Sequence, residues 1–123
     1  MPKQTVIIKA VISPSLKAEF KETVQRKDRV LSQVLRDLIR EYVWRSSKRG
    51  LPVPGKEYAR PHGDLIRAVI DPALKENFEN AAKRNGQLPS RALRGLIREY
   101  VQRHAKGEIW EPGQEIKRQM WAK

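Results

Sequence analysis

Two cationic side chains, Lys9 and Arg67, each stand inside a short run of apolar, mostly β-branched residues. An arginine in such a run can donate two parallel hydrogen bonds to the O6 and N7 acceptors of a guanine. Lysine reaches the same acceptors with less geometric discrimination. Val11 and Val69, two residues further along each run, are suited to packing on thymine methyl groups. The candidate chemistry of these residues is therefore contact with base edges.

Catalytic or metal chemistry has little support. The chain has no cysteine, and its two histidines, His62 and His104, fall in no metal-ligand pattern. It contains no plausible Ser-His-Asp grouping and no glycine-rich phosphate loop. We therefore expect no catalytic residues, no metal site and no cofactor.

The charge of the chain favours an anionic partner. It has 26 Lys and Arg against 14 Asp and Glu, a net charge of +12, and an isoelectric point near 10.4. Such an excess favours nucleic acid or an anionic surface and makes binding salt-sensitive. No apolar run has membrane-spanning length, and no signal-peptide segment follows Met1. We expect a cytoplasmic protein without a membrane partner.

The elements that position these residues occur twice, 58 residues apart and without a gap. Residues 7–46 and 65–104 are identical at 19 of 40 positions, and repeats of this size determine the architecture. We divide the chain into repeat 1 (1–46), a Pro- and Gly-rich linker (47–64), repeat 2 (65–104) and a C-terminal tail (105–123). A unit this short cannot bury a self-sufficient core. The two units must stabilise each other or pair with units of another chain.

Each repeat is expected to begin with a strand that runs directly into a helix. Residues 6–12 and 65–70 favour strands and end at a Ser-Pro and an Asp-Pro pair, in which Ser or Asp caps a helix that has proline at its first position. These first helices end near Asp28 and Gly86, where a left-handed conformation is tolerated. An apolar residue recurs every four positions in each first helix, giving the stripes Leu16, Phe20, Val24 and Leu74, Phe78, Ala82.

A second helix follows in each repeat, with Ser32 or Ser90 as its N-cap. Its apolar residues follow an i, i+1, i+4, i+5 pattern, which predicts a wide buried face. Four residues are expected to lie outside this face, Arg36, Asp37, Arg40 and Glu41, with Asp37 and Arg40 able to pair across one turn.

Alternation along each strand separates two faces. One face of each strand is entirely apolar, and the other carries the cation. Because a buried, unpaired Lys or Arg is very costly, the face with the cation is expected to point outward. The outward residues are then Ile7, Lys9 and Val11 in repeat 1 and Leu65, Arg67 and Val69 in repeat 2.

A strand, a proline-initiated helix, a short turn and a second helix resemble the ribbon-helix-helix family of DNA-binding proteins. Segments 69–75 and 90–97 carry the resemblance most clearly, and the tandem form is similar to TraY-like conjugation proteins. The resemblance implies a mainly α fold with a short two-stranded antiparallel ribbon that lies in the DNA major groove. Two ribbon-helix-helix units in one chain imply an intramolecular pseudo-dimer, and pairing swapped between two chains is the alternative.

The resemblance also assigns site residues. The strand residues that contact bases would be Lys9, Val11, Arg67 and Val69, with Ile7 and Leu65, which can instead pack on the linker. The start of each second helix would face a phosphate, with contacts from Ser32, Gln33, Ser90 and Arg91. Arg36 and Arg94 recur at the same position of the two repeats and would form an ion pair within the pseudo-dimer or contact DNA.

The expected function is sequence-specific binding of double-stranded DNA, most simply as a transcriptional repressor that occludes a promoter. Because Lys9 corresponds to Arg67 and Gln33 to Arg91, the expected site is an imperfect inverted repeat. Two alternatives are a conjugation accessory protein that binds near a transfer origin and an antitoxin that inhibits a partner protein. The tail, 105–123, can cover the domain, contact a second pseudo-dimer on DNA or bind a protein partner.

Overall fold

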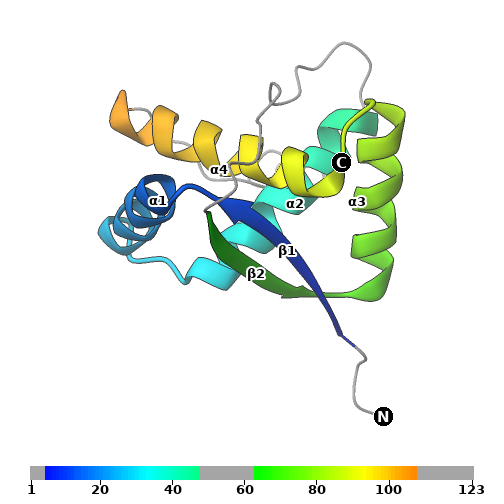
Figure 1. Ribbon diagram of the computed structural model, residues 1–123, viewed down its shortest axis with the longest axis horizontal. Coiled ribbons are helices and arrows are strands. Elements are labelled where there is room, and N and C mark those ends of the chain that lie inside the picture. Colours follow the sequence, from blue (N-terminus) through cyan, green and yellow to red (C-terminus); the bar gives the residue numbers. More distant parts are fainter. Residues whose placement is uncertain (1–4, 48–62, 108–123) are drawn as a thin grey trace, which may run out of the picture.

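Two strands and four helices make up the part of the chain that the structure describes, residues 5–47 and 63–107 of a computed structural model (Figure 1). In chain order they are β1 (Val6–Ile12), α1 (Pro14–Arg26), α2 (Leu31–Ser47), β2 (Asp64–Ile70), α3 (Pro72–Arg84) and α4 (Pro89–Ala105). The predicted class, mainly helical with one two-stranded antiparallel sheet, is confirmed. Most of the predicted linker and C-terminal tail lies outside the described residues. Within the described ranges, no helix combines the length and the apolar character needed to span a bilayer.

The two strands come from different repeats and pair antiparallel. Lys9 lies opposite Arg67, which is its equivalent in repeat 2. The ladder is symmetric about this pair. Val6 lies opposite Ile70 at one end, and Ile12 lies opposite Asp64, the equivalent of Val6, at the other. Each strand thus satisfies backbone N–H and C=O groups that the other would leave unpaired.

The predicted starts and ends of the first helices are confirmed. The Ser13 hydroxyl accepts a hydrogen bond from the Leu16 amide at 3.2 Å, and the Asp71 carboxylate accepts one from the Ala73 amide at 2.7 Å. Proline occupies the first helical position in both helices. Asp28 and Gly86, just beyond the helix ends, have φ values of 54° and 68°. This left-handed conformation ends each helix and redirects the chain.

The prediction that Ser32 and Ser90 cap the second helices is wrong. Helix α2 begins at Leu31, and α4 begins at Pro89 with Leu88 as an N-cap that makes no side-chain hydrogen bond. Proline at the first helical position is favourable because its missing N–H is not needed there and its φ already suits a helix. Helix α4 therefore starts one residue before Ser90. Ser32 and Ser90 each lie inside the first turn of their own helix.

The hydrophobic core is shared between the repeats. Phe20 of α1 lies edge-to-face on Tyr100 of α4, with ring centroids 5.5 Å apart. In the equivalent place of the other half, Phe78 of α3 lies on Tyr42 of α2 at 5.2 Å. All four rings are at most 2% exposed. The first helix of each repeat therefore packs against the second helix of the other repeat, and neither repeat encloses a core alone.

The second helices also contact each other. Arg45 of α2 donates to the Glu99 carboxylate of α4 at 2.9 and 3.1 Å. Glu41, which the sequence predicts outside the buried face, is only 3% exposed, so that expectation is wrong. Its burial follows from the packing of α2 against both α3 and α4, which covers more of the helix surface than one apolar stripe accounts for.

Replacing Phe20 or Phe78 with alanine should destabilise both repeats together. Each change removes a fully buried ring and should lower the free energy of unfolding by about 3–5 kcal/mol. Urea denaturation followed by circular dichroism should show one transition, shifted to lower urea concentration, in both variants. Two separate transitions, in which one repeat stays folded after the other has unfolded, would contradict the shared core.

Candidate nucleic-acid interface

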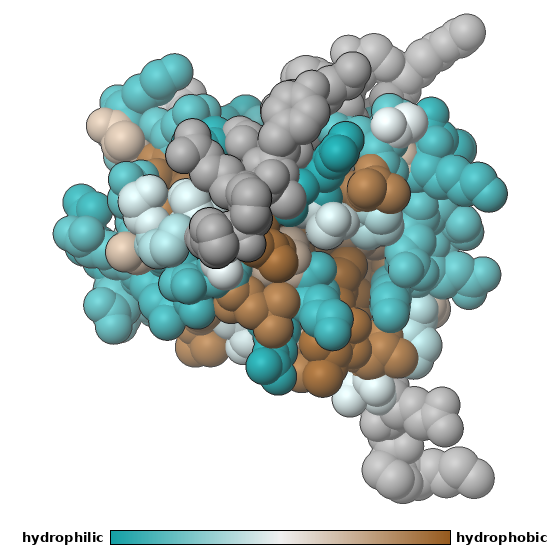
Figure 2. Space-filling view, in the orientation of Figure 1, coloured by the Kyte–Doolittle hydropathy of each residue, from teal (hydrophilic) through white to brown (hydrophobic). Residues whose placement is uncertain are grey.

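The two strands bury one face and expose the other, as the alternation predicts. The buried face packs on the core and consists of Ile8, Ala10, Ile12, Ile66, Ala68 and Ile70. On the opposite face, Ile7, Leu65 and Val69 are 49%, 38% and 45% exposed. Lys9 and Arg67 are exposed as well, and Val11 is half-buried. We call these six outward residues the ribbon face; Figure 2 shows hydrophobic residues gathered over the strands with hydrophilic residues among them.

The ribbon face has a basic centre and apolar flanks. Lys9 and Arg67 lie directly opposite each other across the ladder. On one side of them is the pair Ile7 and Val69, and on the other the pair formed by Val11 and Leu65. Side chains directly opposite on adjacent strands have Cβ atoms about 5 Å apart. The six predicted base-contacting residues are therefore brought together on one surface.

Two arginines, whose role the sequence left open between an ion pair and a DNA contact, connect the second helices to the strands. Arg94 of α4 donates from Nη1 to the Val11 carbonyl oxygen at 3.0 Å. Its equivalent, Arg36 of α2, donates from Nη1 to the Val69 carbonyl oxygen at 3.3 Å. Each of these bonds reaches a main-chain carbonyl of the other repeat, whereas the sequence predicted an ion pair or a DNA contact. The recurrence of arginine in both repeats was the only signal for this role, and it did not specify the acceptor.

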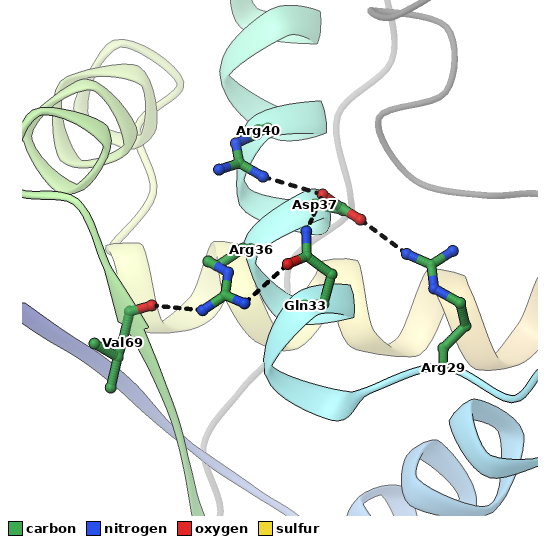
Figure 3. Close-up of polar contacts among 6 residues, drawn as sticks. All are labelled: Arg29, Gln33, Arg36, Asp37, Arg40 and Val69. Atoms are coloured by element: carbon green, nitrogen blue, oxygen red, sulfur yellow. Dashed lines mark hydrogen bonds and ion pairs between the residues drawn. The ribbon is translucent and has the colours of Figure 1, made fainter.

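A hydrogen-bonded network centred on Asp37 holds the start of α2 (Figure 3). The Asp37 carboxylate accepts from Arg29 at 2.9 Å, from Gln33 at 3.0 Å and from Arg40 at 3.1 Å. Gln33 in turn accepts from Arg36 at 2.8 Å. The predicted pairing of Asp37 with Arg40 is confirmed. The expectation that Asp37 lies outside the buried face is wrong, because these partners surround it and leave it 4% exposed.

The network has no equivalent carboxylate in repeat 2. Gly95 occupies the position of Asp37, and Arg91 occupies that of Gln33. The start of α4 therefore carries one cation more and one carboxylate fewer than the start of α2 at these two positions. The two halves of the molecule are similar in backbone and unequal in charge.

The four predicted phosphate-contacting residues all lie in the first turns of the second helices. Ser32 and Gln33 belong to α2, and Ser90 and Arg91 belong to α4. Each is half-buried. The first turn of a helix presents N–H groups that have no partner within the helix, together with the positive end of the helix dipole. Contact with phosphate stays a prediction for all four.

Comparisons with known proteins give no relative. No protein-family model matches the chain, no curated protein matches it, and no solved structure matches its fold. Among residues 5–47 and 63–107, no group of three or more His, Asp or Glu side chains is placed to hold a metal ion. The physical character of the ribbon face is therefore the basis for the function proposed below.

Arg94→Met should weaken the fold more than Arg36→Met. Methionine keeps the apolar stem but removes the donor to the Val11 carbonyl oxygen, and losing a partner for a buried acceptor costs about 1–3 kcal/mol. The bond from Arg36 is longer and more exposed, so a smaller loss is expected. Urea denaturation of both variants measures the difference. A larger loss in Arg36→Met would contradict this ranking.

Proposed function

We propose that this protein binds specific sequences of double-stranded DNA by placing the ribbon face in the major groove. The observation that carries this proposal is the pairing of Lys9 with Arg67 at the centre of an exposed face. Like charges directly opposite each other on adjacent strands destabilise a sheet. The pair is therefore unfavourable for folding alone and becomes favourable beside a polyanion. The net charge of +12 supports the same class of partner.

The dimensions of duplex DNA suit this surface. The major groove of B-form DNA is about 12 Å wide and admits a two-stranded ribbon. It also presents the guanine O6 and N7 acceptors that Arg67 and Lys9 are equipped to contact. An A-form RNA major groove is too deep and narrow for the same insertion. Double-stranded DNA is therefore the favoured nucleic acid.

We assign the fold to the ribbon-helix-helix type, with the two repeats acting as a pseudo-dimer within one chain. The antiparallel ladder centred on Lys9 and Arg67 supports this assignment, and so does the exchange of helix contacts between repeats. The approximate two-fold axis would coincide with a two-fold axis of the duplex. Strand pairing swapped between two chains would give the same surface, and a mass measurement in solution separates the two arrangements.

The preferred site would be an imperfect inverted repeat. At its centre lysine and arginine differ in how strictly they select guanine. At its flanks the Asp37 network on α2 contrasts with Gly95 and Arg91 on α4. The half-site next to repeat 2 would therefore show the stronger guanine preference and the stronger phosphate attraction.

Selection of bound duplexes from a random DNA library, at about 150 mM salt to suppress nonspecific attraction, tests the proposal. Enrichment of a slightly asymmetric inverted repeat is the expected result. The genomic position of that repeat would then distinguish a promoter, as expected of a repressor, from a transfer origin, as expected of a conjugation accessory protein. Absence of enrichment, with binding that disappears as salt rises, would refute sequence-specific recognition.

Arg67→Ala should relax the preference at one guanine and leave the fold intact. Loss of a bidentate contact corresponds to about 1–3 kcal/mol of discrimination, which repetition of the selection with the variant would reveal. The matched control is Arg84→Ala, which removes the same charge from the exposed last residue of α3, at the end of that helix away from the strands (Figure 1). An unchanged site preference in Arg67→Ala would refute the assignment of this side chain.

A further inference from the structure

The ribbon face exposes more apolar surface than a basic DNA-contacting surface requires. Five large hydrophobic side chains of the described residues are exposed, and three of them, Ile7, Leu65 and Val69, lie on this face. Val11, half-buried, completes a set of four. Exposed apolar side chains gathered on one surface indicate a site of interaction. Only two of the six outward residues are polar, so most of the contact surface is aliphatic.

The four aliphatic side chains are placed symmetrically. Ile7 with Val69 forms one cross-strand pair, and Val11 with Leu65 forms the other, on opposite sides of the basic pair. Outward residues on one strand are separated by about 7 Å, which is the rise of two base-pair steps in B-form DNA. Each aliphatic pair would therefore face bases about two steps from those that Lys9 and Arg67 contact.

The major groove offers one apolar group to such side chains. Besides hydrogen-bond donors and acceptors, its edges carry the C5 methyl group of thymine, where cytosine has only a hydrogen atom. An aliphatic side chain pressed against the amino group of cytosine or the O6 of guanine would desolvate that group without replacing its hydrogen bond. Cytosine methylated at C5 presents a methyl group at the same ring position as thymine.

We infer that the four aliphatic side chains of the ribbon face select pyrimidines that carry a C5 methyl group, on both sides of the central base pairs. The ligand is thymine in unmodified DNA, and 5-methylcytosine supplies the same group in methylated DNA. This inference rests on the proposed function, because it requires the ribbon face to lie in the major groove. It adds that contacts with methyl groups, and not hydrogen bonds, select the bases on either side of those that Lys9 and Arg67 contact.

Deoxyuridine provides the direct test, since it differs from thymidine only by the missing methyl group. Each flanking thymidine of the selected duplex is replaced singly, and the dissociation constant is measured with the full chain. Burial of one methyl group corresponds to about a fourfold change in affinity, so each replacement should weaken binding by about that factor. Replacement of thymidines outside the flanks should leave affinity unchanged.

A second arm separates the two sources of the methyl group. A flanking T·A pair is changed to C·G and to 5-methyl-C·G in matched duplexes. The methylated duplex should bind more tightly than the unmethylated one. Tighter binding to 5-methyl-C·G than to T·A would identify methylated DNA as the preferred ligand, and the reverse order would identify thymine.

Protein variants connect the effect to the side chains. Val69→Thr replaces one of the two valine methyl groups with a hydroxyl at an exposed position and should reduce the sensitivity to deoxyuridine at the base that Val69 faces. Val30→Thr is the matched control, because Val30 is exposed, precedes α2 and is not part of the ribbon face. That variant should retain the full sensitivity.

The outcomes distinguish this inference from the function on which it rests. Specific binding to the selected duplex with no response to deoxyuridine at any position overturns the inference and leaves the proposed function standing. Failure to select any specific duplex overturns the proposed function itself, and the inference with it. Loss of sensitivity in Val30→Thr would show that the effect does not arise at the ribbon face and would also overturn the inference.

Discussion

Pairing of β1 with β2 is the constraint on which the rest of the structure depends. An isolated strand exposes unpaired N–H and C=O groups, and a unit of one strand and two helices is too small to bury a core. The ladder centred on Lys9 and Arg67 solves both problems, because its register aligns the two repeats. In that alignment α1 lies against α4 and α2 against α3, and the two aromatic pairs fill equivalent places in one core.

The same register concentrates unfavourable features on the outward side of the strands. Two cations oppose each other, and aliphatic side chains remain in contact with water. Neither feature stabilises the fold. Recurrence of the arrangement in both strands is therefore better explained by a partner than by folding. In the proposed complex, the polyanionic groove compensates the charges and base methyl groups cover the aliphatic side chains.

The differences between the two halves are as important as their symmetry. In the first half, the Asp37 carboxylate draws Arg29, Gln33 and Arg40 into one network and offsets part of the charge of the two arginines. In the second half, Gly95 stands in its place. In the proposed complex, the linked pair of unequal units would present two different half-surfaces to DNA, which two identical copies of one small subunit would not do. The tandem sequence would thus permit a preferred orientation on an asymmetric site.

Short-range sequence patterns were sufficient to predict the parts of this protein that depend on a few neighbouring residues. The sequence by itself determined the two strands, their outward faces and the proline-initiated first helices, because alternation and capping act over two to four positions. It misplaced the start of α4 because Pro89 and Ser90 compete for the same turn. Only the tertiary structure decided that Arg94 bonds the Val11 carbonyl oxygen and that Asp37 is buried. Those contacts depend on which repeat supplies the adjacent strand and on how neighbouring side chains close around a carboxylate, and no short-range pattern contains that information.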